Sequence, residues 1–354
     1  MFRLFEGQTA DEVWQKIAAA FRAADGTAEQ TSRAGMSNEI LHAAISIADP
    51  RQRWVVSRQP AMNIAFALAE VVWIMNGRND SAFLNYFNSG LPHYAGNGPT
   101  YPGAYGHRLR QNLGLDQLNR AYDALRSRSD SRRVVLQIWD GRLDSPHAGG
   151  EETELDIPCN VVSMLKVRGG KLEWTQIIRS NDLYRGLPYN FVQFTTLQEL
   201  MAGWLGVAVG SYNQISDSLH VYSANVESVR ASYPIDSAVN TDSLAFGKQA
   251  SDAAFTELAR AVELIITQRT TVDDLLHRPS QSALPVPFKN ILCVLCAEGA
   301  RRRRRVEAAK ELIAGCSNMA YQQLYGRWLN ACADRTGQRA NATHKNSAEE
   351  DHHQ

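Results

Sequence analysis

The sequence predicts an α+β fold in which helices flank a large sheet with substantial antiparallel pairing. Three observations support this prediction. Residues 61–76 are so apolar that they must form a buried helix, and β-branched runs joined by Gly169-Gly170 read as a hairpin. A strongly helical run at 192–207 is then followed by strand-like residues at 209–222.

The other elements follow the same periodicities. Helical spacing of apolar residues predicts four further helices, over 11–24, 80–88, 114–128 and 254–269. Prolines and glycines predict a loop over 90–105 that is long enough to be functional. The sheet is expected to begin at residue 132, where β-branched runs replace the helical pattern.

Composition and charge exclude several classes of protein. Among 354 residues, 37 basic side chains balance 37 acidic ones, so no global field indicates a nucleic-acid or membrane partner. The N-terminus lacks a signal-peptide pattern, and no apolar stretch is long enough to span a bilayer. Five scattered cysteines do not form a disulfide framework and fit a reducing compartment, so we expect a cytoplasmic protein.

The chain divides by composition into three parts. Residues 1–295 are expected to form one large domain, residues 296–334 a C-terminal helical appendage, and the polar residues 335–354 a disordered tail. The appendage opens with the arginine run 301–305, for which a solvated face or an interface is favoured over a nucleic-acid patch. Cysteines are too sparsely spaced for a strong zinc signal, so no metal is expected; they are Cys293, Cys296, Cys316 and Cys332.

Cys159 stands in the segment Asp-Ile-Pro-Cys-Asn, directly before a strand-like run, where a side chain can face a cleft. Taken alone, a single cysteine is more often a buried small hydrophobe. Twenty residues later, Arg179 stands beside Ser180, a pairing suited to gripping a phosphate, and a nearby cation would also increase the thiolate fraction of a cysteine. This neighbourhood favours a reactive role for Cys159.

In the spacing of Cys159, Arg179 and the residues that follow them, the chain resembles the thymidylate synthase and pyrimidine hydroxymethylase family. The matching groups are Pro158-Cys159, Arg179-Ser180-x-Asp182, Gly186-x-Pro188-x-Asn190 and His220-x-Tyr222. Looser similarities lie upstream, at Arg33, Glu70, Tyr105, Arg132 and Arg133. The resemblance implies the three-layer fold of thymidylate synthases, with a large mixed or antiparallel sheet flanked by helices.

The resemblance also implies the chemistry. Cys159 would add to C6 of a pyrimidine nucleoside monophosphate, which activates C5 to attack the one-carbon unit of 5,10-methylenetetrahydrofolate. The phosphate would be held by Arg33, Arg179 and Ser180, together with Arg132 and Arg133 of a second subunit. An obligate homodimer that binds a nucleotide and a reduced folate, and needs no metal, is therefore expected.

Further roles are implied for the remaining groups. Asn190 can both donate and accept at O4 and N3, which suits uracil, whereas an Asp there would suit cytosine. His220 and Tyr222 would bind the ribose 3′-hydroxyl, and Asp182 and Gly186 the folate. Glu70 would organise proton transfer through water, and Tyr105 and Asn160 complete the catalytic set. On residue type alone, His220 is better explained as a satisfied strand histidine, and a carboxylate inside an apolar helix needs a partner or a raised pKa.

The sequence departs from the family pattern at four places. Asn160 follows the nucleophile where His is usual, and Ser218 replaces an acidic residue, although Asp217 is adjacent. The 90–105 loop has no Trp to close over the folate, and the usual apolar closing segment at the C-terminus is not visible. Conversion of dUMP to dTMP is the main expectation; 5-hydroxymethylation of a uracil or cytosine nucleotide, and an inactive nucleotide-binding paralogue, stay open as alternatives.

Overall fold

A mixed sheet of seven strands runs through the residues described by the computed structural model, which are 1–32, 35–146 and 156–350, with side chains as far as residue 334. The strand order is β1-β3-β7-β6-β5-β4, and β2 pairs with β3. The β1–β3 and β6–β7 pairs are parallel, and the others are antiparallel. The strands are β1 Arg3–Gly7, β2 Ala28–Ser32, β3 Gly35–Ile47, β4 Val134–Gln137, β5 Asn160–Arg168, β6 Lys171–Asp182 and β7 Ala208–Tyr222.

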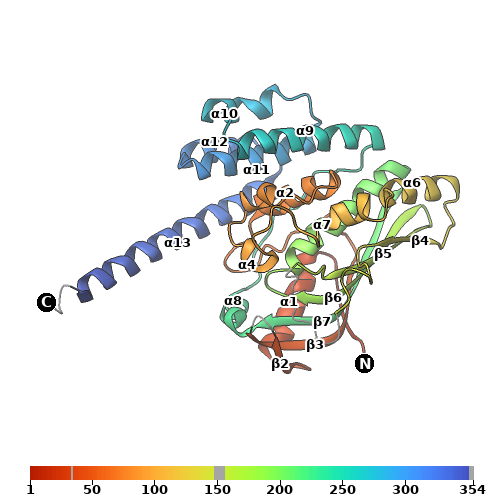
Figure 1. Ribbon diagram of the computed structural model, residues 1–354, viewed down its shortest axis with the longest axis horizontal. Helices are drawn as coiled ribbons and strands as arrows, with labels where there is room; N and C mark the ends of the chain where they lie inside the picture. The colour runs from red at the N-terminus through yellow and green to blue at the C-terminus, as the bar shows by residue number, and fades with distance from the viewer. Residues whose placement is uncertain (33–34, 147–155, 351–354) are drawn as a thin grey trace.

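Helices stack beside this sheet in two tiers, with α2, α6 and α7 near the strands and α9–α12 beyond them (Figure 1). The longer helices are α1 Ala10–Arg22, α2 Ile64–Met75, α6 Gln117–Ser127, α7 Leu187–Leu205, α9 Lys248–Ile266, α10 Val272–Gln281, α11 Val286–Arg302, α12 Val306–Ala314 and α13 Met319–Glu350. The short ones are α3 Ser81–Asn85, α4 Pro92–Ala95, α5 Tyr105–His107, the π-helix η1 Arg108–Asn112, the 3₁₀ turn η2 Ser223–Asn225 and α8 Val226–Arg230. The sheet and two helical tiers confirm the predicted fold class.

The hairpin at Gly169-Gly170 is confirmed, but the expected start of the sheet at residue 132 is wrong. Both glycines have positive φ, 54° and 74°, and they join the antiparallel strands β5 and β6. Three strands precede residue 132, namely β1, β2 and β3. Every residue of β2 is exposed, so it carries no apolar signal, and β3 is held in place by pairing with β7, more than 160 residues later.

Caps and prolines set the helix boundaries. The predicted buried helix is α2, whose Asn63 cap accepts a hydrogen bond from the backbone N–H of Phe66 (3.0 Å). Helix α7 begins at Leu187, five residues before the predicted start, because Pro188 is tolerated in the first turn of a helix. The first turn of α7 therefore carries Asn190, which the sequence left in a loop.

No helix ends at the boundary predicted between residues 295 and 296, which falls inside α11. Near its end, the carboxylate of Glu298 is fully buried and accepts hydrogen bonds from Arg301 (2.6 and 2.8 Å), Arg302 (2.9 Å) and Trp328 of α13 (3.3 Å). A buried carboxylate needs such paired cations to remain charged. The first arginines of the 301–305 run therefore neutralise an internal charge and tie the last helices to the body.

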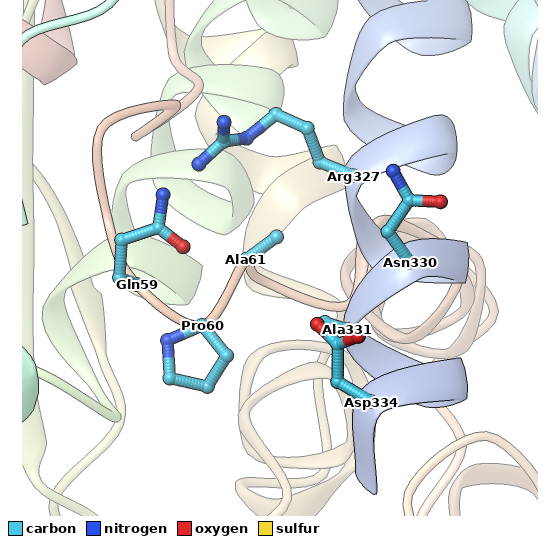
Figure 2. Close-up of a pocket in the computed structure, with 7 residues that line it drawn as sticks. All are labelled: Gln59, Pro60, Ala61, Arg327, Asn330, Ala331 and Asp334. Atoms are coloured by element: carbon cyan, nitrogen blue, oxygen red, sulfur yellow. The ribbon is translucent and has the colours of Figure 1, made fainter. Parts of the chain in front are cut away.

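Helix α13 lies against the body at its N-terminal end and then extends away from it (Figure 1). Tyr321 packs edge-on against Trp54, with ring centroids 5.5 Å apart. A cavity of about 380 Å³ remains where α13 crosses the segment leading into α2, and Figure 2 shows Arg327 projecting from α13 towards Gln59 at its edge. The rest of its lining is Pro60, Ala61, Asn330, Ala331 and Asp334.

The described backbone of α13 continues through Glu350, and the disorder expected for residues 335–354 stays a prediction. Residues 335–350 contain no proline, and the docked first half of α13 supplies the helical nucleus that an isolated polar segment lacks. Within the described part of the chain, no helix is both long and apolar enough to cross a membrane.

Candidate active site

Cys159 is half-buried in the loop that leads into β5, and Arg179 of β6 fixes this loop. The Arg179 backbone N–H donates to the Cys159 carbonyl (2.9 Å), and its guanidinium donates to the carbonyls of Pro158 (3.0 Å) and Ile157 (3.2 Å). The same guanidinium lies over the ring of Trp139, 5.3 Å from its centroid. Sequence reasoning had overlooked Trp139. Arg179 thus positions the thiol as well as placing a positive charge beside it.

Tyr105 and Asn160 lie on one side of the thiol. The Tyr105 side chain is hydrogen-bonded to that of Asn160, and burial raises the pKa of Tyr105 well above its usual range, with the nearby Cys159 acting in the same direction. The phenol is therefore a neutral hydrogen-bonding group at any physiological pH. The structure thus brings together three of the four residues predicted to be catalytic.

Glu70, the fourth, is the carboxylic acid inside the apolar helix α2. Burial raises its pKa to about 8, although a hydrogen bond with the Gln193 side chain lowers it. Its Oε2 atom is buried without a hydrogen-bond partner among the described residues. Glu70 also contributes to the raised pKa of Tyr105, so it belongs to the same cluster. The raised pKa anticipated from the sequence is what the structure gives, and it leaves a protonated acid available at neutral pH.

Asn190 reaches the cluster from the first turn of α7. Its Oδ1 accepts a hydrogen bond from Asn160 Nδ2 (3.3 Å), and its Nδ2 donates to Asn181 Oδ1 (3.2 Å). Asn160 is completely buried and Asn190 is 6% exposed. The predicted base-reading amide is therefore held from both sides by other amides.

Asp182, His220 and Tyr222 form a second group at the ends of β6 and β7. Asp182 and His220 are direct neighbours in the parallel pairing, and the rings of His220 and Tyr222 are 5.0 Å apart. Burial lowers the pKa of His220, while Asp182 and Glu39 oppose that shift, so the imidazole stays largely neutral at physiological pH. A neutral imidazole can accept a hydrogen bond from a hydroxyl group.

Asp182 has one carboxylate oxygen engaged and one free. Its Oδ1 accepts from the backbone N–H groups of Tyr184 (2.7 Å) and Arg185 (2.9 Å), whereas its Oδ2 is buried with no partner among the described residues. The loop ends at Gly186, whose backbone N–H donates to the Asp182 carbonyl (3.0 Å). An oriented, unmatched carboxylate oxygen suits a ligand that presents N–H donors.

Glu39 is a further acidic residue at this end of the sheet, and it was missed. It lies directly opposite His220 on β3 and accepts a hydrogen bond from Ser218. Asp217, the neighbour considered from the sequence, instead pairs with His42 (3.0 Å) among exposed groups. Glu39 thus brings a carboxylate to Ser218 from another strand, 181 residues upstream of His220, and no local pattern could have indicated it.

The predicted phosphate ligands are only partly gathered. Ser180 neighbours Arg179 on β6, half-buried and opposite Ser218. Arg132 and Arg133 are exposed just before β4, and neither makes an ion pair among the described residues. Arg33 lies outside the described residues.

Tyr94 of the 90–105 loop lies near the group formed by Asp182, His220 and Tyr222. Its hydroxyl accepts a hydrogen bond from Arg185 (2.6 Å), and the Arg185 guanidinium lies 4.9 Å from the Tyr94 ring and 5.7 Å from that of Tyr222. Tyr94 is nevertheless 43% exposed. The loop therefore contacts Arg185, which lies beside Tyr222, through an exposed tyrosine.

Three of the four cysteines considered for zinc are buried thiols. Burial raises the pKa of Cys293 to about 11 and of Cys296 and Cys316 to about 12, so these thiols stay protonated. Among the residues that the structure describes, no cluster of three or more ligating side chains could hold a metal ion.

Comparison with known proteins gives a consistent set of matches. The family model for thymidylate synthase matches residues 23–249. Deoxyuridylate hydroxymethyltransferases of Bacillus phage SP01 and Pseudomonas phage M6 are 37% and 36% identical over 195 and 175 residues, or 52% and 49% of this chain. The chain spans about half of their length, 50% and 48%. A putative thymidylate synthase of Methanothermobacter marburgensis is 28% identical over 221 residues, covering 62% of this chain and 92% of that protein.

Proposed function

Because the chain belongs to the thymidylate synthase family, we propose that it transfers a one-carbon unit from 5,10-methylenetetrahydrofolate to C5 of dUMP. The observation that carries this proposal is the setting of Cys159, beside Tyr105 and Asn160 in a loop fixed by Arg179. A thiolate there would add to C6 of the uracil ring and make C5 nucleophilic, which splits one difficult substitution into two easier steps.

The surrounding groups fit the parts of such a complex. Arg179 and Ser180 would hold the phosphate, and His220 with Tyr222 the sugar 3′-hydroxyl. The unmatched Oδ2 of Asp182 would accept hydrogen bonds from the pterin of the folate. Asn190 would read O4 and N3 of the base. Glu70, protonated up to about pH 8, would donate a proton through water as charge develops on O4.

Between the two possible products we favour 5-hydroxymethyl-dUMP, with dTMP as the second candidate. After the one-carbon unit joins C5, loss of the C5 proton and cleavage of its bond to tetrahydrofolate would leave an exocyclic methylene. This group would take either water, giving hydroxymethyl, or hydride from the tetrahydrofolate still bound beside it, giving methyl and dihydrofolate, and the C6–S bond to Cys159 would break in both cases. Addition of water is favoured over hydride transfer where the site is open to solvent. The exposed Tyr94, the loop without Trp and the names of the phage relatives all favour water.

Product analysis tests this proposal. The protein is incubated with methylenetetrahydrofolate and dUMP, dCMP, UMP or CMP in turn, and the nucleotides are identified by mass. A gain of about 30 Da without dihydrofolate is expected from dUMP, whereas a gain of about 14 Da with dihydrofolate would indicate the synthase. Unchanged nucleotides in all four reactions would refute one-carbon transfer.

A larger aromatic side chain in the 90–105 loop should change the product. We expect Leu91→Trp to raise the methyl fraction severalfold, because the indole would cover the face of the intermediate that water reaches. Leu91 is half-buried at the start of α4, three residues before Tyr94 in the same loop. The product ratio is measured by mass spectrometry with Val306→Trp, in the outer helices, as the control. An unmoved ratio would show that another group governs access of water.

The face of the sheet opposite the helices supports a homodimer. Val162, Ile177 and Ile215 are register neighbours on β5, β6 and β7, and all three are half-buried, whereas the residues on either side of Ile177 and Ile215 are buried. Val135 of β4, on the same side, is 52% exposed. A half-open apolar sheet face is the kind of surface that a second copy covers. We propose that this pairing presents Arg132 and Arg133 to the partner's phosphate.

Mixed chains should complement each other. Cys159→Ser chains lack the nucleophile and Arg133→Ala chains lack a donor to the partner's site, so a heterodimer regains one intact site. Random re-pairing makes half of the dimers mixed with one good site each, and we expect about a quarter of wild-type kcat/KM at low dUMP. Arg133→Ala alone should lose ~10- to 100-fold in kcat/KM, as expected for a charge-assisted hydrogen bond. Cys159→Ser mixed with Arg179→Ala is the control without recovery, and absence of recovery in the test mixture would contradict a shared site.

A further inference from the structure

A continuous chain of buried polar side chains runs from the core of the sheet to Asn190. The Trp174 indole Nε1 (3.2 Å) and the Ser163 hydroxyl (2.5 Å) both donate to Gln176 Oε1. Gln176 Nε2 then donates to Asn160 Oδ1 (3.0 Å), and Asn160 Nδ2 donates to Asn190 Oδ1. All five residues are 6% exposed or less. Solvent is therefore not available to replace a bond that is lost in this chain.

At the Trp174 end of this hydrogen-bonded series the donor and acceptor roles are fixed, because an indole N–H can only donate. Gln176 must present its oxygen to Trp174, so its amide N–H group faces Asn160. Asn160 must then turn its oxygen to Gln176 and its amide N–H group to Asn190. Flipping any one of these amides would set oxygen against oxygen and N–H against N–H in a buried space. The orientation of each amide thus determines the next.

We propose that Trp174 and Gln176, acting through Asn160, fix the flip state of the Asn190 amide and thereby make the site selective for uracil over cytosine. This inference rests on the proposed function of Asn190 as the base-reading group. An amide that is free to flip can match either base, because uracil offers N3–H and O4 whereas cytosine offers N3 and an amino group. A locked amide matches one pattern only. Trp174, Gln176 and Asn160 are thus positioning residues, none of which needs to contact the base.

The other end of the network, beyond Asn190, does not fix the donor and acceptor orientation of the amides. Beyond Asn190, Asn181 Nδ2 and Gln214 Nε2 both donate to Ser216 Oγ (3.1 and 2.9 Å), and Tyr212 donates to Gln214 (2.9 Å). A serine hydroxyl rotates and can both donate and accept, so it tolerates either orientation of Asn181. Tyr212 is as deeply buried as Trp174. Tyr212→Phe therefore perturbs the same network without unlocking Asn190.

The test compares Kd values for dUMP and dCMP by calorimetry, because binding does not require turnover. The wild-type protein is expected to prefer dUMP by ~100-fold or more, as a site that pairs buried polar groups does. Trp174→Phe removes the fixed donor, and the preference should fall at least ~10-fold. In Gln176→Glu the carboxylate can only accept, so Asn160 must donate to it and Asn190 must flip; the preference should shift further towards dCMP. Tyr212→Phe should keep the wild-type ratio, and thermal melting checks that each variant is folded.

Each outcome bears on the inference separately from the proposed function. The proposal that the Asn190 amide is held in one orientation would be overturned by either of two results. One is a wild-type protein that binds dUMP and dCMP equally; the other is folded Trp174→Phe and Gln176→Glu variants that keep the wild-type ratio of Kd values. A fall of similar size in Tyr212→Phe would also overturn it, by showing that general loosening is the cause. One-carbon transfer by the wild-type protein is assayed in parallel. If no transfer occurs but the variants shift the ratio of Kd values, the proposed reaction is refuted while the fixed orientation of the Asn190 amide is supported.

Discussion

Cys159→Ser is expected to lower turnover by ~10⁴-fold or more while changing the Kd for dUMP by less than about threefold. A serine hydroxyl is a far weaker nucleophile than a thiolate, so C6 addition fails. The binding groups should keep their positions, because Arg179 is held by backbone carbonyl groups of the Cys159 loop, which the substitution retains. Single-turnover kinetics and calorimetry measure the two quantities.

Cys332→Ser provides the matched control for this variant. Cys332 is also half-buried, but it lies on α13 outside the site cluster, so its substitution should leave turnover close to that of the wild type. Near-normal turnover in Cys159→Ser would contradict covalent catalysis. A large loss of dUMP affinity in the same variant would instead assign Cys159 a binding role.

Glu70→Gln is expected to lower kcat by ~10²- to 10⁴-fold, the range that positioned acid–base groups supply. Glu70 has a pKa of about 8 in the folded protein, so below this pH it is a neutral acid that can donate a proton. In the wild type, kcat should therefore fall as the pH rises through about 8, and Glu70→Gln should lack this step. The pH profile of kcat measures it, with the surface variant Glu263→Gln as control.

Stability should show the same titration with a defined sign. The folded pKa of about 8 lies above the usual value of 4.5, so Glu70 costs the fold nothing below pH 4.5. As the pH rises above 4.5 the unfolded chain ionises first, and stability is lost progressively up to about pH 8. The melting temperature of Glu70→Gln relative to wild type should therefore increase across this window. A difference that is independent of pH would indicate that Glu70 is not buried as a neutral acid.

Local chemistry made Cys159 and its neighbours readable from the sequence as a candidate site. Cys159, Arg179 and Asp182 are close in sequence as well as in the sheet, so their spacing reflects a shared structure. The hairpin at Gly169-Gly170 was readable because only glycine adopts these positive φ angles without strain. The anomalous carboxylate of Glu70 stood out because an apolar helix offers it no solvent.

Features that depend on long-range pairing were not readable. Glu39 is brought to His220 by the pairing of β3 with β7, and no periodicity within either segment specifies its partner. Gln176 looked like an ordinary strand residue until the register of β5 and β6 joined its amide to that of Asn160. The first turn of α7 was also missed, because the predicted helix began at residue 192, whereas Pro188 is tolerated in the first turn.

Release of tritium from dUMP labelled at C5 is the most direct measurement of the central claim, that this chain substitutes C5 after Cys159 adds to C6. Both possible products require loss of the C5 hydrogen, so the assay does not depend on which forms. The expected result is stoichiometric release of tritium into water that requires methylenetetrahydrofolate and is absent in Cys159→Ser. Retention of the label by a folded protein that binds both dUMP and the folate would contradict the claim.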